Sequence, residues 1–273
     1  MPVSVLLLVA TLAAGSDPAP ANASFLGLDT TMLVLASLAL MLGGFVKGAI
    51  GVGLPVVAIA VLSNFLPVPL LLAIVVIPIL VTNLWQAINA GNLRQPLARF
   101  WPMITCLLVL IWFSARLVVD LDPRILYALI GASVLLFVLS SYFRVQWNVS
   151  PSAERWAGPV AGSLGGFLGG ISTIWGPPMM IYFVMLRLPK EDYIQAVGLV
   201  WFIASIPLVI AYMRYGILTA DTALLSALAC IPGFIGLAIG QTLRRYINQQ
   251  AFTKLLLLFL FLVGLNLLRR AVF

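Results

Sequence analysis

The chain has 273 residues, of which 63% are apolar and 8% are charged, and its mean hydropathy is +1.14. Soluble globular proteins carry about a quarter of their residues as charges, so this composition indicates a polytopic membrane protein with room for roughly eight spans. The net charge of +7 comes from Lys and Arg residues scattered between apolar segments, which excludes a nucleic-acid-binding patch, and the absence of His excludes His-based catalysis and most zinc sites.

In chain order, the first apolar stretch is short. Residues 1–15 resemble a signal peptide without a basic start, so we interpret residues 1–30 as a cleaved or peripheral segment. Polar punctuation divides the remainder into a first repeat, 31–145, a linker, 146–156, and a second repeat, 157–273. Each repeat holds one interrupted apolar segment and then three continuous ones. The first-repeat segments are 31–65, 69–90, 98–119 and 124–143, and the second-repeat segments are 157–187, 193–214, 221–244 and 251–271.

Both interrupted segments contain the same glycine-rich break. LGGF occurs at 42–45 and again at 164–167, which is 122 residues later, and Gly48 recurs at that offset as Gly170. Unwound backbone survives in hydrocarbon only where it is buried in protein or lines a wet cavity. Corresponding breaks in two halves of a chain point to a transporter's binding site. The sequence therefore predicts a secondary transporter.

The charge distribution predicts how the chain crosses the membrane. If both interrupted segments are re-entrant hairpins, the basic residues divide nine to five, and the larger group marks the cytoplasmic side. A hairpin and three spans make an odd number of crossings per repeat, so the second repeat is inverted and both termini lie outside. We therefore expect an all-α membrane protein with two inverted repeats, each a re-entrant helical hairpin plus three transmembrane helices. The inner group is Arg94, Arg99, Arg144, Arg155, Arg187, Lys190, Arg244, Arg245 and Lys254, and the outer group is Arg116, Arg124, Arg214, Arg269 and Arg270.

The repeated motif resembles that of the TauE/SafE family of sulfite and organosulfonate permeases, approximately G-x-x-x-G-x-x-G-x-G-G-x-x-x-x-P in each half. The matching residues are Gly44, Gly48, Gly51, Gly53 and Pro55 in the first copy, and Gly166, Gly170, Gly176, Pro177 and Pro178 in the second. The resemblance covers the chain from about residue 30 onward. Leu54, an early proline and Lys47 depart from the pattern and leave the transported anion open. The resemblance implies a two-repeat carrier in the bacterial inner membrane that moves sulfur-containing anions, often outward.

Lys47 is the charged residue that lies deepest within an apolar segment. Burying its ammonium costs at least about 2.5–3.5 kcal/mol on insertion scales, so we expect Lys47 to contact the substrate. At a hairpin tip, the N-termini of half-helices would direct partial positive charge at the same anion. The alternative is that Lys47 extends to an interface or caps its own half-helix.

The glycines of the breaks are candidates for backbone recognition of an anion. Without a β-carbon, the N–H groups of Gly48, Gly51, Gly53, Gly170 and Gly176 would be open to a ligand. Close helix packing is the alternative explanation, because glycine serves that purpose in membranes as well.

Five polar or aromatic residues complete the predicted site. Ser172, Thr173 and Trp175 lie in the second break and would donate hydrogen bonds to sulfite or sulfonate oxygens. The alternative is that the hydroxyls bond to their own helix and the indole packs. Asn83 and Gln86 share a helix face, so they would either line the cavity or hold neighbouring helices together.

The sequence thus predicts an inner-membrane permease that exports sulfite, sulfonates or related organic anions by alternating access. Its expected partners are a small anion and the lipid bilayer, with a homodimer as the candidate assembly, and we expect no catalytic residue, metal, cofactor or nucleic acid. An anion channel of the same fold is one alternative. An intramembrane enzyme is another, for which only a Lys47–Ser172 pair could be proposed. The carboxylates all lie in loops or at segment ends, which argues against a proton relay but leaves sodium coupling open.

Overall fold

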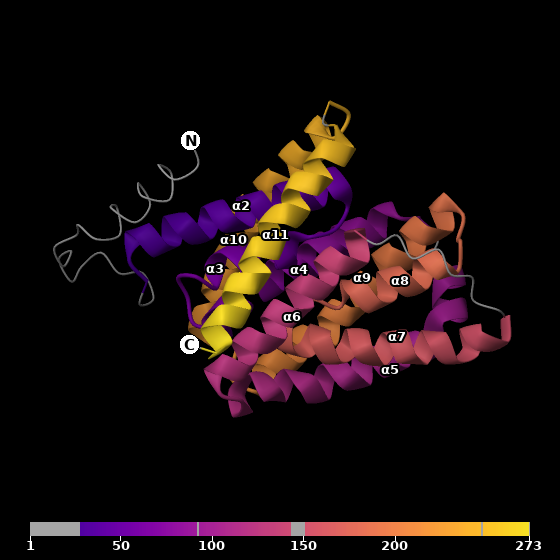
Figure 1. Ribbon diagram of the computed structural model, residues 1–273, viewed down its shortest axis with the longest axis horizontal. Coiled ribbons are helices and arrows are strands. Elements are labelled where there is room, and N and C mark those ends of the chain that lie inside the picture. The colour runs from indigo at the N-terminus through magenta and orange to yellow at the C-terminus, as the bar shows by residue number, and fades with distance from the viewer. Residues whose placement is uncertain (1–27, 92, 143–150, 247, 273) are drawn as a thin grey trace.

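A computed structural model describes residues 28–91, 93–142, 151–246 and 248–272. Within those residues the chain forms ten helices and no strand (Figure 1). Residues 1–27 of the expected N-terminal segment and 146–150 of the expected linker lie outside the described residues, whereas 151–156 begin a helix. The helices are α2 (Thr30–Ile50), α3 (Leu54–Leu62), α4 (Val68–Asn89), α5 (Arg94–Asp120), α6 (Pro123–Tyr142), α7 (Pro151–Ser172), α8 (Gly176–Met185), α9 (Lys190–Arg214), α10 (Ala220–Leu243) and α11 (Gln249–Val272).

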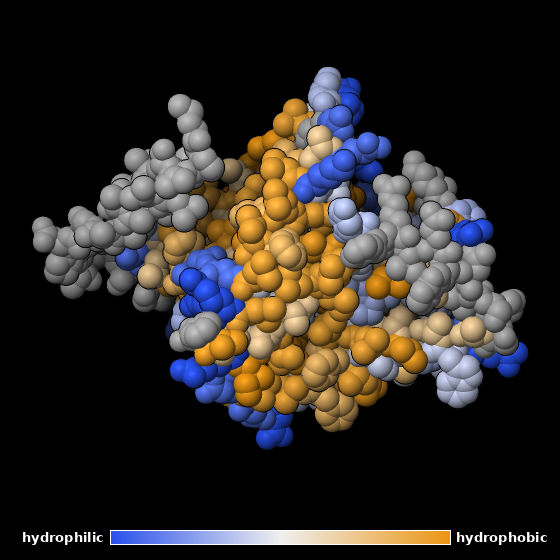
Figure 2. All heavy atoms as spheres, in the orientation of Figure 1, coloured by the Kyte–Doolittle hydropathy of each residue, from blue (hydrophilic) through white to orange (hydrophobic). Residues whose placement is uncertain are grey.

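Seven of these helices are long and apolar enough to cross a bilayer, namely α2, α4, α5, α6, α9, α10 and α11. The six continuous segments expected from the sequence correspond to α4–α6 and α9–α11, with every boundary within four residues. Their outer faces are apolar, as Figure 2 shows for the face that α11 crosses. On α11, Leu255, Leu258 and Leu262 are each more than half exposed, which suits contact with lipid. The predicted all-α membrane architecture is confirmed.

Both interrupted segments are helix–break–helix units. The first is α2, a break at 51–53, and α3, and the second is α7, a break at 173–175, and α8. In each unit the second helix runs back along the first, because Gly43 packs against the backbone of Leu54 and Ala58, and Gly165 packs against Met179. This confirms the predicted chain reversal. In each unit the first helix is the longer one: α2 has 21 residues and α3 has 9, and α7 has 22 residues and α8 has 10.

The hairpin of each repeat packs on a helix of the other repeat. α2 lies against α10, and α7 lies against α5, as Figure 1 shows for the second pair. A β-carbon on Gly44 would collide with the Gly233 carbonyl oxygen, and one on Gly166 would collide with the Leu107 carbonyl oxygen. Glycine is needed at these crossings because the two backbones approach so closely. Consequently one continuous core contains residues of both repeats.

The contacts between equivalent helices support an inverted relation between the repeats. α4 and α9 run antiparallel, because Asn83 bonds to Ser205 while Ala87 packs against Gly198. α6 and α11 also run antiparallel. The Asn83 Nδ2–Ser205 Oγ distance is 3.5 Å, and these residues are 122 positions apart, which is the repeat offset. Equivalent residues that touch each other lie on the axis that relates them, and antiparallel partners require that axis to be perpendicular to the helices. The inverted orientation in a bilayer stays a prediction.

Pro78 interrupts the hydrogen bonding of α4 one turn before the residues of the candidate site. Proline has no N–H, so the Ile74 carbonyl loses its partner within the helix. Ser226 of α10 supplies the missing donor, because its Oγ donates to the Ile74 carbonyl oxygen at 2.9 Å and accepts from the Ile77 N–H at 3.1 Å. Hydrogen bonds to α10 therefore fix the position of α4 one turn before Thr82 and Asn83.

Candidate binding site between the two breaks

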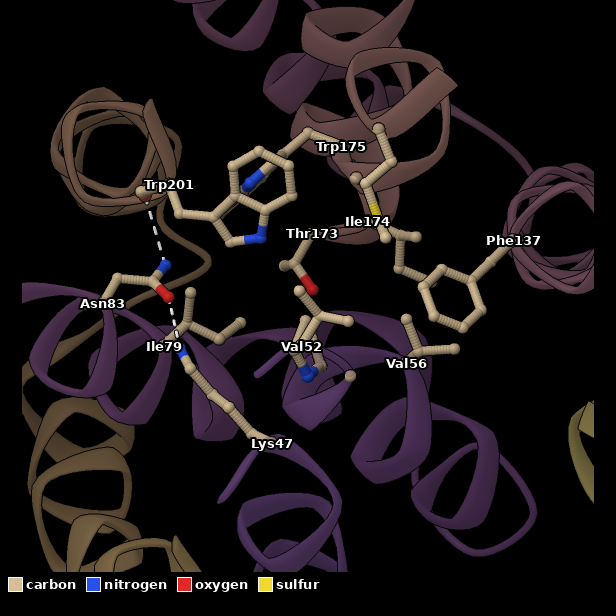
Figure 3. Close-up of a pocket in the computed structure, with 14 residues that line it drawn as sticks. Lys47, Val52, Val56, Ile79, Asn83, Phe137, Thr173, Ile174, Trp175 and Trp201 are labelled. Atoms are coloured by element: carbon tan, nitrogen blue, oxygen red, sulfur yellow. Dashed lines mark hydrogen bonds between the residues drawn. The ribbon is translucent and has the colours of Figure 1, made fainter. Parts of the chain in front are cut away.

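The two breaks meet at a small buried cavity of about 20 Å³, as predicted for the hairpin tips (Figure 3). Val52 and Gly53 of the first break form one part of its wall, and Thr173 and Trp175 of the second form another. A cavity of this size holds about one water molecule. The site is therefore built jointly by both repeats, at the point where their helices are unwound.

Lys47 lies at this cavity and is 5% exposed. Its Nζ donates hydrogen bonds to Thr82 Oγ1, at 3.1 Å, and to Asn83 Oδ1. An ammonium has three N–H donors, so one is left over by these two bonds. The ion pairs within the described part of the chain do not include Lys47. Neutral dipoles alone compensate the buried charge there, and a bound anion would supply the counter-charge.

A row of hydrogen bonds fixes Lys47 across the boundary between the repeats. Asn83 Nδ2 donates to the Trp201 carbonyl oxygen at 3.1 Å as well as to Ser205 Oγ. Ser205 Oγ in turn donates to the same carbonyl at 2.8 Å. Figure 3 shows Lys47 and Asn83 linked in this way beside the cavity. Lys47 therefore extends into the protein towards α4, and Asn83 links it onward to α9.

Thr173 occupies an unusual backbone position in the second break. Its φ is 58°, in the left-handed region that β-branched residues rarely adopt, and Gly51 holds the equivalent position in the first break with φ 97°. Thr173 is 1% exposed, and its Oγ1 has no hydrogen-bond partner among the residues that the structure describes. Strained backbone and an unpaired buried hydroxyl each cost free energy, and both features concentrate at functional sites.

A wider space adjoins the small cavity. This vestibule has a volume of about 620 Å³ and shares Lys47, Val52 and Met180 with the cavity. It is formed where the ends of α2, α4 and α10 meet the start of α9, so it lies at the end of the bundle to which the sequence assigns the inner basic residues. Besides Lys47 and Thr82, its polar lining residues are Gln86, Asn89, Tyr193, Gln241 and Arg244.

The residues predicted from the sequence fall into three groups. The small cavity is lined by Lys47, Gly53, Asn83, Thr173, Trp175 and Gly176. The vestibule is lined by Gly48, Gly51 and Gln86, and the Gln86 Oε1 is buried without a hydrogen-bond partner in the described chain. Gly170 and Ser172 line neither space. Gly170 packs tightly against α5, and Ser172 Oγ donates to the Leu168 carbonyl oxygen at 2.7 Å, so both fit the structural alternatives considered above. Lys47 and Ser172, the pair considered above for an intramembrane enzyme, hydrogen-bond to Thr82 and to the Leu168 carbonyl oxygen and not to each other.

Three residues that take part in the hydrogen bonds of the site were missed by the sequence reasoning. Ser205 lies one repeat offset after Asn83, so the offset of 122 would have identified it. Thr82 directly precedes Asn83, and Trp201 is a tryptophan in the middle of a span, one turn before Ser205. Nothing in the sequence marks Phe137 or Met180, which complete the apolar wall.

Comparison with known protein families supports the interpretation of the glycine motif. A family model described as "Sulfite exporter TauE/SafE" matches residues 35–267, which is nearly the whole chain. The match includes both breaks and every residue of the small cavity. Searches of curated proteins and of solved structures found no match.

Proposed function

The chain belongs to the sulfite exporter TauE/SafE family of membrane permeases, and from this premise we propose that it is an inner-membrane secondary transporter. Its cargo is sulfite, a sulfonate or a related small organic anion, which it exports by alternating access. The observation that carries the proposal is the buried Lys47 ammonium, which lies between the two breaks with an unused donor and without a carboxylate partner in the described chain.

The groups around the cavity match the chemistry of an oxyanion. Lys47 offers an ammonium N–H, Thr173 a hydroxyl, and the indoles of Trp175 and Trp201 carry donors only. Every oxygen of a sulfite or sulfonate is an acceptor, and hydrogen bonds to charged groups are about twice as strong as neutral ones. The cavity holds only about one water, so a bound anion requires the wall at Val52 and Met180, shared with the vestibule, to move.

The position of the vestibule supports loading from the cytoplasm. It opens at the ends of α4 and α10 and the start of α9, with Arg244 in its lining, and α5 and α9 begin at Arg94 and Lys190 at the same end of the bundle. The positive-inside rule places these residues on the cytoplasmic side. An inside-negative potential then drives a singly charged anion outward by about 2.3 kcal/mol per 100 mV, so export requires no coupling ion.

An asymmetry between the repeats supports alternating access. The vestibule is lined by Gln86, Asn89 and Ala90, among others. The residues 122 positions later in the second repeat are Leu208, Ala211 and Tyr212, and each of them is 0% exposed. The Tyr212 hydroxyl donates to the Gly170 carbonyl oxygen at 3.0 Å, at the position equivalent to Gly48 of the vestibule. The inner vestibule is thus open while its outer equivalent is packed. If the two repeats exchanged conformations, access would pass to the outer side, whereas a channel needs both sides open at once.

The test of this proposal is transport by variants at Lys47. Purified protein is reconstituted into proteoliposomes and export of radiolabelled sulfite is measured, with taurine and sulfoacetate as further substrates. Lys47→Met keeps the length and removes the charge, so it should insert normally and bind the anion roughly 10- to 150-fold more weakly, because a charge-assisted bond contributes about 1.5–3 kcal/mol. Lys47→Arg should weaken transport as well, because a planar guanidinium does not replace a compact ammonium. Lys254→Met, at an exposed position of α11, is the matched control.

Two outcomes would contradict the proposal. Transport by Lys47→Met at the wild-type rate would show that Lys47 does not contact the anion. In a carrier, unlabelled anion on the far side accelerates the exchange of labelled anion. If this countertransport is absent, the protein is a channel instead of a carrier.

A further inference from the structure

The end of α3 is held against α6 and α11 by a group of polar contacts, at the opposite end of the bundle from the vestibule. Arg270 of α11 donates hydrogen bonds to the Ser63 carbonyl oxygen and, at 3.2 Å, to the Tyr127 hydroxyl. Its guanidinium also lies over the Tyr127 ring, 4.4 Å from the centroid. One turn earlier on α11, Asn266 Nδ2 donates to Asn64 Oδ1 at 3.0 Å. We call these five residues the clasp.

The clasp is built from contacts that can break without leaving a buried charge. Ser63 directly follows α3, and the last carbonyls of a helix lack partners within it and carry partial negative charge, which attracts a guanidinium. Neither ion pair of the described residues includes Arg270, and this residue is only partly buried. Water can therefore replace the carbonyl and the hydroxyl when the helices separate.

The clasp closes a place whose equivalent at the other end of the bundle is open. There, α6, α8 and α11 surround a crevice of about 450 Å³, and Val184 of α8, which lines it, is 48% exposed. The residue 122 positions earlier is Leu62 of α3, which is 1% exposed. Leu256 lines the crevice from α11, and its equivalent on α6, Val134, is 0% exposed. The same three-helix arrangement is thus open at the inner end and packed at the outer end, where the clasp lies.

The chain does not repeat the clasp at the inner end. At the offset of 122, Tyr127 corresponds to Gln249. Arg270 corresponds to Asn148, which lies outside the described residues. The sequence therefore provides the arginine and the tyrosine only on the outer side, so the two ends are not equally easy to open.

We infer that the clasp is the outer gate of this transporter, which is formed while the vestibule is open and breaks when the outer side opens. The inference rests on the proposed function, since it requires access to alternate between the two sides. The clasp favours the inward-open state, in which a cytoplasmic anion enters. Losing a hydrogen bond to a charged group should shift the ratio of outward-open to inward-open protein by roughly 10- to 150-fold.

The first test prevents the clasp from opening. Asn64→Cys and Asn266→Cys are combined in a cysteine-free background, reconstituted into proteoliposomes and joined by a short bis-methanethiosulfonate reagent. The cross-linked protein should lose sulfite export and recover it on reduction. Sulfite should still raise its melting temperature, because the inner side stays open. Each single cysteine variant, treated with the same reagent, is the control.

The second test removes the clasp. A Val134→Cys reporter is labelled from outside in spheroplasts with an impermeant thiol reagent, and Arg270→Gln should raise its labelling rate by roughly 10- to 150-fold. Arg270→Lys retains a charged donor and should give a smaller increase. Arg269→Gln, at the neighbouring exposed position, is the matched control and should leave the rate unchanged.

The possible results separate the gate from the function on which it rests. Export by the cross-linked protein at the rate of its reduced form would overturn the gate and leave the proposed function in place. Unchanged labelling of the reporter in Arg270→Gln would show that the clasp only supports the structure. If the wild-type protein exports none of sulfite, taurine and sulfoacetate, the proposed function fails and the gate fails with it.

Discussion

Replacing Thr173 with glycine should make the empty protein more stable and the anion site weaker. Thr173 adopts φ 58° and buries a hydroxyl that has no partner within the described residues, so its native conformation carries two costs. The left-handed conformation costs roughly 1–2 kcal/mol, and an unpaired buried hydroxyl costs about 1–3 kcal/mol. Glycine relieves both. In return it raises the conformational entropy of the unfolded chain, which lowers the stability by about 0.4–1 kcal/mol, and it loses two buried carbons, Cβ and Cγ2, which lowers the stability by about 1.6 kcal/mol.

The mid-range values of these four contributions give a net stabilisation of about 1 kcal/mol for Thr173→Gly. Each kcal/mol shifts the melting temperature of a chain of this size by about 2–4 °C, so the ligand-free Tm should rise by roughly 2–4 °C. The anion, however, loses a hydrogen bond worth about 1.5–3 kcal/mol, so its Kd should increase roughly 10- to 150-fold.

The assay is thermal unfolding of the purified protein with and without sulfite or methanesulfonate. Thr173→Ser retains the hydroxyl and should keep the Kd within a few-fold of the wild type. Gly51→Thr, at the equivalent position of the first break, should instead destabilise the protein by about 1–2 kcal/mol, because it introduces the same strain. A Thr173→Gly protein with an unchanged or lower Tm and an unchanged Kd would refute both the strain argument and the role of the hydroxyl.

Two further substitutions test the packing around the site. Tyr212→Phe removes the hydrogen bond to the Gly170 carbonyl, worth about 0.5–1.5 kcal/mol, so a Ser172→Cys reporter in a cysteine-free background should react two- to tenfold faster with an impermeant thiol reagent added outside. Unchanged labelling would mean that Tyr212 does not hold the outer side closed. Ser226→Ala leaves the Ile74 carbonyl without its donor and should lower the stability by about 1–3 kcal/mol, measured by thermal unfolding. A wild-type Tm would show that another group satisfies this carbonyl.

The positions of the helices were largely determined by the sequence. Hydrocarbon requires backbone hydrogen bonds to be satisfied within each segment, so long apolar runs form helices and polar or proline-rich stretches separate them. For that reason α4 and α6 agree with the predicted segments to within one residue at each end. The breaks were readable as well, because several glycines and a proline cluster at each of them, whereas a single proline such as Pro78 is accommodated within a helix. Lys47 was conspicuous because a charge in an apolar segment is costly.

The partners of these residues were decided only by the tertiary structure. In a membrane protein the lipid-facing and the buried faces of a helix are both apolar, so periodicity does not tell which face packs against which neighbour. The sequence alone therefore could not show that Gly170 packs on α5 while Gly53 lines the cavity, since both are glycines of the breaks. Nor could it pair Lys47 with Thr82, because this contact depends on how α2 and α4 are rotated about their axes. The open vestibule and its packed outer equivalent are likewise one arrangement of two similar repeats, and a single sequence is compatible with either side being open.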